Sequence, residues 1–127
     1  MRVLVADDEV TILVTLRDAL EDAGHTVLGA TDTTSALKAL DEEPAPEVVV
    51  TDVRMPGKGG MTVLEEALRR DPERPVLLMT GYASVDDAVG AMRRGAVDYI
   101  QKPFRNEAIV RRIETLGQIA DLAEENR

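Results

Sequence analysis

The stretch from Glu47 to Gly60, EVVVTDVRMPGKGG, decides how the rest of the chain is interpreted. Four residues that favour a strand, Val48 to Thr51, lead directly into Asp52, and a loop rich in glycine follows. An uninterrupted apolar run of this kind is typical of a parallel strand buried on both faces. An acid at the end of such a strand is costly unless it is solvated, bound to a metal or chemically reactive. We therefore place Asp52 at the centre of the functional site.

The composition indicates a single ordinary domain. The chain has 127 residues, a net charge of −9 and no cysteine, which excludes disulfides and thiolate metal sites. The negative charge argues against direct contact with the backbone of a nucleic acid. No apolar run approaches the roughly 18 residues of a membrane span. The first residues, MRVLVADDE, turn acidic too early for a signal peptide. We therefore expect a cytoplasmic protein that does not contact a membrane.

A strand followed by a helix recurs five times along the sequence. The expected strands are residues 2–6, 26–30, 48–52, 75–80 and 97–101. Alternation of this kind predicts a parallel sheet with right-handed crossovers and helices on both faces. We expect an α/β, flavodoxin-like, doubly wound five-stranded sheet with strand order 2-1-3-4-5.

Apolar spacing predicts the inward face of each helix. In the first helix these residues are Val10, Leu13, Leu16 and Leu20, and in the helix that Ser84 begins they are Val85, Ala88, Val89 and Met92. Thr33 or Thr34 is expected to cap the second helix. His25, which follows a glycine that stops a helix, is expected to lie exposed in a loop.

Polar residues follow the carboxyl ends of four expected strands: Asp7 and Asp8, then Asp52, Thr80 and Lys102. Strands 1 and 3 are neighbours in the proposed order, so three carboxylates would crowd together. Like charges at such short range cannot all remain ionised without a cation, and Mg²⁺ suits oxygen ligands. A metal, a hydroxyl and an ammonium suit the transfer of a phosphoryl group. Asp52 stands alone on the central strand and is therefore the expected nucleophile.

Four motifs together, ADD, TDVRMPGKGG, TGYAS and DYIQKPF, resemble the receiver domain of two-component response regulators over roughly residues 2–116. The resemblance implies that Asp52 accepts phosphate from a phosphohistidine on a histidine kinase or phosphotransfer protein. It implies that Asp8 and Asp52 bind Mg²⁺ with the main-chain carbonyl of Arg54, and that Asp7 acts mainly through water. RMPG and KPF are most similar to receivers of enhancer-binding transcriptional activators, so the expected output is transcriptional.

The resemblance also implies a switch. Thr80 would bond the new phosphate, Lys102 would pair with it, and Tyr99 would turn inward as Thr80 moves. The Lys102–Pro103 peptide bond would be cis. The domain would at most catalyse its own phosphorylation and dephosphorylation and is not expected to be an enzyme. Tyr82 is expected to shield the phosphate from water.

The C-terminal helix carries a heptad seam: Ile109, Ile113, Leu116, Ala120 and Ala123. We expect a receiver domain over residues 1–116 and a helical extension over residues 117–127, although Gly117 weakens the helix there. The seam predicts a longer native protein or a homodimer through this helix. The surface formed by the helix that Ser84 begins, the strand over residues 97–101 and the C-terminal helix is a second expected dimer face.

Four other interpretations remain open from the residues alone. Asp7 and Asp8 could be a solvated loop pair, and Tyr99 could be a core residue. A Mg²⁺-dependent phosphatase or phosphotransferase would use the same aspartyl phosphate, but no substrate pocket or second general acid can be recognised. A flavodoxin-like cofactor site is disfavoured because acids follow strand 1, where they would repel a flavin phosphate.

Overall fold

The computed structural model describes residues 1–81 and 85–125, in which strands and helices alternate as expected. The elements are β1 (Arg2–Ala6), α1 (Val10–Asp22), β2 (Thr26–Ala30), α2 (Thr33–Leu40), β3 (Val48–Asp52), α3 (Gly60–Arg70), β4 (Val76–Thr80), α4 (Val85–Arg93), β5 (Asp98–Gln101) and α5 (Asn106–Glu125). The strands pair in parallel in the order β2-β1-β3-β4-β5, which confirms the predicted fold.

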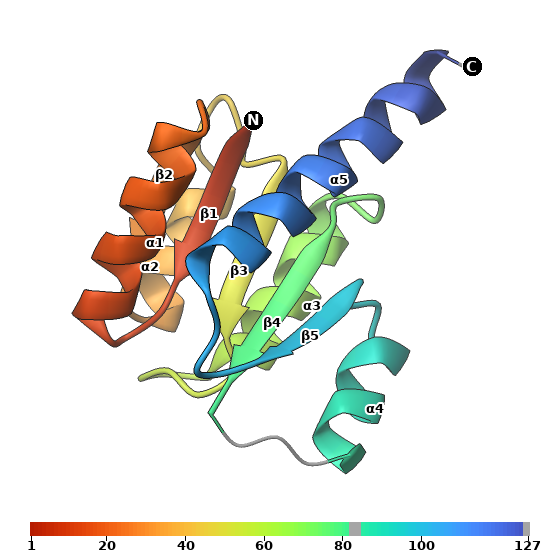
Figure 1. Ribbon diagram of the computed structural model, residues 1–127. Helices are drawn as coiled ribbons and strands as arrows, with labels where there is room; N and C mark the ends of the chain where they lie inside the picture. Colours follow the sequence, from red (N-terminus) through yellow and green to blue (C-terminus); the bar gives the residue numbers. More distant parts are fainter. Residues whose placement is uncertain (82–84, 126–127) are drawn as a thin grey trace.

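The sheet separates two aliphatic cores. Helices α1 and α5 cover one face and α2, α3 and α4 lie on the other (Figure 1). Successive strand residues point to opposite faces: Val3 and Val5 pack with α1 and α5, whereas Leu4 packs with α2 and α3. Burial on both faces explains why the central strands read as continuous apolar runs.

Helix α1 buries three of its four predicted inward residues. Leu13, Leu16 and Leu20 lie in the core, but Val10 is 60% exposed, so the prediction for Val10 is wrong. The helix begins only after a loop has left the end of β1, and its first turn therefore lies beyond the edge of the sheet.

Helix α4 presents a different face to the sheet from the predicted one. Val89 and Met92 are 42% and 48% exposed, whereas Ala91 is fully buried in the core beside α2 and α3. Both the valine–methionine side and the alanine side have helical spacing, so spacing alone cannot choose between them. The small side chain of Ala91 allows close packing, and that side faces inward. The predicted cap Ser84 and the side chain of Val85 lie outside the described residues.

Asp32 caps α2, and the prediction of Thr33 or Thr34 is wrong. Asp32 Oδ1 accepts hydrogen bonds from Ser35 N at 2.7 Å and from Ser35 Oγ at 2.8 Å. A carboxylate one residue earlier in the chain takes the position that a threonine hydroxyl would fill. Thr33 is thereby free to bind elsewhere.

His25 is not an exposed loop residue. Its side chain is 9% exposed, Nδ1 lies 3.1 Å from the amino group of Met1, and Nε2 lies 3.9 Å from Glu114 Oε1. Gly24, with φ of 93°, turns the chain back toward the sheet after α1. Burial and the nearby Met1 ammonium lower the pKa of the imidazole below its usual value.

Helix α5 has a packed part and a projecting part. Ile109 and Ile113 are fully buried against the sheet, Leu116 is half-buried and Ile119 is 58% exposed. The helix continues past the body of the domain (Figure 1). Ala120 and Ala123 of the predicted seam lie outside the residues whose side chains are described. Within the described residues, no helix combines the length and apolarity that crossing a membrane requires.

Candidate functional site

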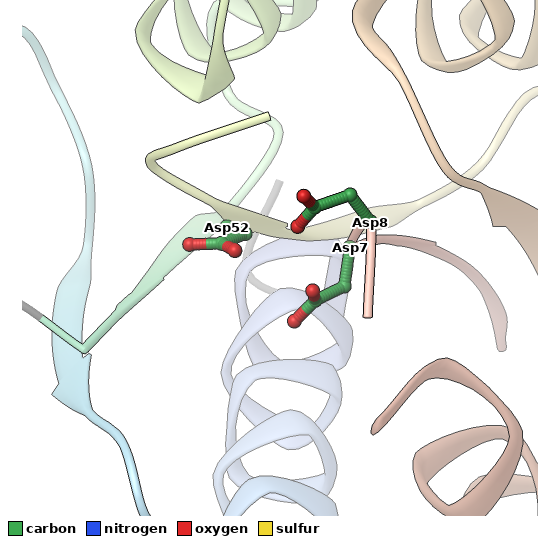
Figure 2. A group of neighbouring side chains, drawn as sticks. All are labelled: Asp7, Asp8 and Asp52. Carbon is green, nitrogen blue, oxygen red and sulfur yellow. The ribbon is translucent and has the colours of Figure 1, made fainter. Parts of the chain in front are cut away.

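Three carboxylates meet at the carboxyl edge of the sheet, as predicted. Asp7 and Asp8 follow β1, and Asp52 ends the neighbouring strand β3, where Ala6 stands opposite Thr51. The side chains lie beside one another (Figure 2), with a carboxylate oxygen of each within 4.8 Å of the others. Asp7 and Asp52 are buried and Asp8 is exposed, so the group opens to solvent on one side.

Asp7 is fixed by the loop that leaves β1. Its amide donates to Ala30 O at 3.0 Å, and its Oδ1 accepts from Glu9 N at 2.9 Å. Burial raises the pKa of Asp7, and a hydrogen bond from Lys102 opposes that rise. Asp7 is therefore held in place, and the neighbouring Lys102 cation stabilises its buried charge.

Lys102 reaches the acids from the end of β5. Its Nζ lies 2.7 Å from Asp7 Oδ2 and 3.1 Å from Asp52 Oδ2. Burial disfavours the charged ammonium, but hydrogen bonds to these two acids outweigh burial and raise the pKa of Lys102. Its backbone amide donates to Thr80 O at 2.7 Å, which holds the end of β5 beside β4. The peptide bond that follows, Lys102–Pro103, is cis, in agreement with the resemblance.

A cavity of about 210 Å³ opens above Asp52. Its lining residues are Asp8, Glu9, Asp52, Arg54, Gly81 and Lys102. The backbone amide of Arg54 donates to Asp52 Oδ1 at 3.3 Å, so the loop after β3 contacts the acid directly. Glu9, with Oε1 3.4 Å from Lys102 Nζ, was not singled out from the sequence, although its place directly after Asp7 and Asp8 was a usable signal.

Thr80 and Tyr99 lie on the same face of the sheet. Thr80 is buried at the end of β4. Leu78, two residues before it, packs in the same core as Tyr99, so the alternation of the strand directs Thr80 to that face. Tyr99 also lines a cavity of about 180 Å³ with Val53, Met61, Gly90 and Arg94. Tyr82, the predicted shield of the phosphate, lies outside the described residues.

The donor set fits a hard divalent cation. The three clustered side chains offer only oxygen ligands, and the cavity leaves room for water and one substrate oxygen. The ammonium of Lys102 cannot by itself neutralise three carboxylates. Mg²⁺ at this edge would balance the remaining charge.

Comparisons with known proteins agree with this geometry. Residues 3–114 match the family model described as the response regulator receiver domain. The chain is 37% identical over 126 residues to the C4-dicarboxylate transport transcriptional regulatory protein DctD of Pseudomonas aeruginosa, covering 99% of this chain and 27% of that protein. It is 38% identical over 112 residues to the DNA-binding transcriptional regulator NtrC of Escherichia coli, covering 88% and 24%. The chain thus spans about a quarter of the length of these relatives.

A solved structure of the same kind superimposes closely. The response regulator receiver domain protein from Clostridium thermocellum gives a TM-score of 0.88 at 33% identity, covering 96% of this chain and 98% of that one.

Proposed function

Because the chain belongs to the family of response regulator receiver domains, the signalling switches of two-component systems, we propose that Asp52 is its phosphoacceptor. The observation that carries this assignment is that each carboxylate oxygen of Asp52 has its own partner. Oδ1 accepts from the amide of Arg54, and Oδ2 lies 3.1 Å from Lys102 Nζ. Asp52 is thereby oriented at the floor of a cavity that can admit a phosphoryl group.

Receiver domains generally bind Mg²⁺ at an acidic pocket. For this chain we infer that Asp8, Asp52 and the main-chain carbonyl of Arg54 hold the ion and that Asp7 acts through water. The ion would neutralise charge between the acceptor and the incoming phosphoryl group. Asp7 and Glu9 also hold the Lys102 ammonium beside Asp52.

The proposed donor is a phosphohistidine of a histidine kinase or phosphotransfer protein. One oxygen of Asp52 forms a bond to phosphorus while the bond from phosphorus to the imidazole nitrogen breaks, and the electron pair remains on that nitrogen. Lys102 pairs with the phosphoryl oxygens that Asp52 acquires. The Thr80 hydroxyl bonds the same phosphate. Self-catalysed hydrolysis ends the signal: water attacks phosphorus, the bond from phosphorus to the Asp52 oxygen breaks, and inorganic phosphate leaves the regenerated carboxylate.

The output of the switch is proposed to pass through α4, β5 and α5. Tyr99 of β5 lies beside a cavity of about 180 Å³, which gives its ring space to change position as Thr80 moves. Val89 and Met92 of α4 and Val97 before β5 are exposed apolar residues. Exposed apolar side chains on these elements suit contact with a second copy of the chain or a partner domain.

The relatives are transcriptional regulators about four times as long as this chain. We therefore propose that residues 1–116 form the receiver, that residues 117–127 connect it to an output domain in the same protein, and that the output is transcriptional. The part of α5 that continues past the body of the domain can also support a homodimer, whereas Ile109 and Ile113 of the seam are buried against the sheet. The receiver itself would not contact DNA or a membrane, and its kinase partner would meet it in the cytoplasm.

Intact-mass measurement after incubation with Mg²⁺ and acetyl phosphate tests the assignment. The wild-type protein should gain one phosphoryl group, and Asp52→Asn should gain none. Asp18→Asn, which changes an exposed acid of α1, is the matched control and should behave as wild type. An adduct on Asp52→Asn would refute the assignment. Repeated turnover of a phosphate monoester would favour a phosphatase instead.

A further inference from the structure

The hydroxyl of Thr33 ties α2 to the loop between β3 and α3. Thr33 Oγ1 accepts from Gly59 N at 2.9 Å and lies 3.2 Å from Pro56 O and 3.4 Å from Gly59 O, either of which its proton can reach. The backbone amide of Thr33 also donates to Pro56 O at 3.1 Å. A single buried residue therefore contacts both ends of the segment from Pro56 to Gly59.

The anchor that Thr33 provides is rigid. Asp32 caps the helix through Ser35, which fixes the first turn of α2, and the side chain of Ala36, the next residue, is fully buried. Thr33 itself is only 3% exposed. Water has little access to replace its hydrogen bonds, so losing the hydroxyl would leave the Gly59 amide without its partner.

The same loop is tied to the phosphoacceptor strand at its other side. Gly60 N donates to Val53 O at 2.9 Å, and Arg54 N donates to Asp52 Oδ1 at 3.3 Å. The residues between these ties have little freedom once Thr33 holds the outer end. The position of the Arg54 main chain beside Asp52 therefore depends on two attachments, one of them on a different helix.

The loop has the shape that this attachment requires. Gly57 has φ of 97°, and a Cβ built on it would lie 3.1 Å from both Cβ and Oγ1 of Thr33. Gly59 has φ of 84°, which points its amide at the hydroxyl. These glycines serve the approach to Thr33 more directly than any contact with a phosphate.

We propose that Thr33 is a positioning residue for cation binding: its hydroxyl holds the β3–α3 loop so that the Arg54 main chain stays in place beside Asp52. This inference rests on the proposed function, because it takes the Arg54 carbonyl as a ligand. Thr33 is not among the residues that line the cavity above Asp52, where the cation and the phosphoryl group would bind. It acts by reducing the number of loop conformations that binding must select.

The test compares two variants. Thr33→Val keeps the shape of the side chain and removes the hydroxyl, whereas Thr33→Ser keeps the hydroxyl and removes the methyl group. Thr62→Val is the matched control, because the Thr62 hydroxyl also bonds the loop, at Lys58 O, but on the exposed side. Mg²⁺ dissociation constants are measured by calorimetry on each protein. Hydrogen exchange of the Gly59 amide is followed by NMR without metal.

Thr33→Val should bind Mg²⁺ about fivefold more weakly, the factor that one net hydrogen bond typically supplies, and its Gly59 amide should exchange faster. Thr33→Ser and Thr62→Val should keep the wild-type dissociation constant. Saturating Mg²⁺ should restore the rate of phosphorylation of Thr33→Val, since a positioning defect raises the metal requirement and spares the chemical step.

Unchanged Mg²⁺ affinity in Thr33→Val would overturn this inference and leave the proposed function intact. Weaker binding that Thr33→Ser fails to rescue would also overturn it, since the hydroxyl would not be the cause. Failure of the wild-type protein itself to bind Mg²⁺ would instead refute the proposed function.

Discussion

The ammonium of Lys102 lies 3.1 Å from Asp52 Oδ2, although β4 separates the strands that carry the two residues. The long side chain crosses the end of β4 and reaches the acids of the two central strands. A cation from the edge of the sheet thus stabilises charge at its middle. The two residues are 50 positions apart in sequence, and only the strand order brings them together.

Replacing Lys102 by Met should destabilise the protein chiefly when metal is absent. The buried acids Asp7 and Asp52 would lose their cation, at a cost of about 2–3 kcal/mol in the free energy of unfolding. Mg²⁺ should recover much of that loss and bind more tightly than to wild type, since a competing positive charge is gone. Urea unfolding with and without Mg²⁺ measures both effects. Lys58→Met, at an exposed loop position, should change neither.

Gly60→Ala should directly disturb Asp52, the proposed phosphoacceptor. A Cβ at Gly60 would overlap the carbonyl oxygen of Asp52 and lie 2.7 Å from its carbonyl carbon. Backbone atoms must move, so we expect the free energy of unfolding to fall by about 3 kcal/mol and phosphorylation to be slower. Gly90→Ala in α4 is the contrasting change, because nothing lies within 4 Å of its added Cβ. Gly90→Ala should raise the free energy of unfolding by about 0.5–1 kcal/mol. Thermal unfolding of both variants measures the difference. A higher melting temperature for Gly60→Ala than for Gly90→Ala would contradict the prediction.

His25 should make the stability depend on pH. Its pKa in the folded protein is lowered from 6.5, so the unfolded chain binds the proton more tightly. The free energy of unfolding should therefore fall as pH drops through 6.5 toward the folded pKa, and this part of the pH dependence should be missing in His25→Gln. Urea unfolding at several pH values tests the difference. The chain has one histidine, so its NMR titration gives the folded pKa directly; a value above 6.5 would contradict the prediction.

The orientation of α4 can be tested by two neighbouring substitutions. Ala91→Asn places an amide in the core and should lower the free energy of unfolding by about 2–3 kcal/mol. Met92→Asn changes a side chain that is 48% exposed and should cost less than about 1 kcal/mol. Chemical unfolding of the two variants separates these values. Equal costs would mean that Met92 packs inward after all.

The sheet and the acids were predictable because four of the five strands lead into a distinct polar residue at their carboxyl ends. The run into Asp52 shows a strand buried on both faces, and the alternation of strands with helices restricts the order of the sheet. Parallel strands then bring Asp7, Asp52 and Lys102 to one edge without any knowledge of individual contacts. The position of Lys102 between two carboxylates follows from this topology.

Contacts that depend on local competition were not predictable. Asp32 and Thr33 are both able to cap a helix, and only the structure shows that Asp32 does so while Thr33 binds a loop more than 20 residues away. In α4, two faces satisfy the same periodicity. His25 is buried by contacts with the start of β1 and with α5, which no short stretch of sequence can show.

Helix α5 is continuous from Asn106 to Glu125, while its deeply buried contacts end at Ile113. The remaining 12 residues, 114–125, form a lever about 18 Å long at 1.5 Å per residue. A tilt of about 10° at its packed base would move the far end by about 3 Å. Small rearrangements near β5 are thereby amplified by leverage, with no need for the body of the domain to deform.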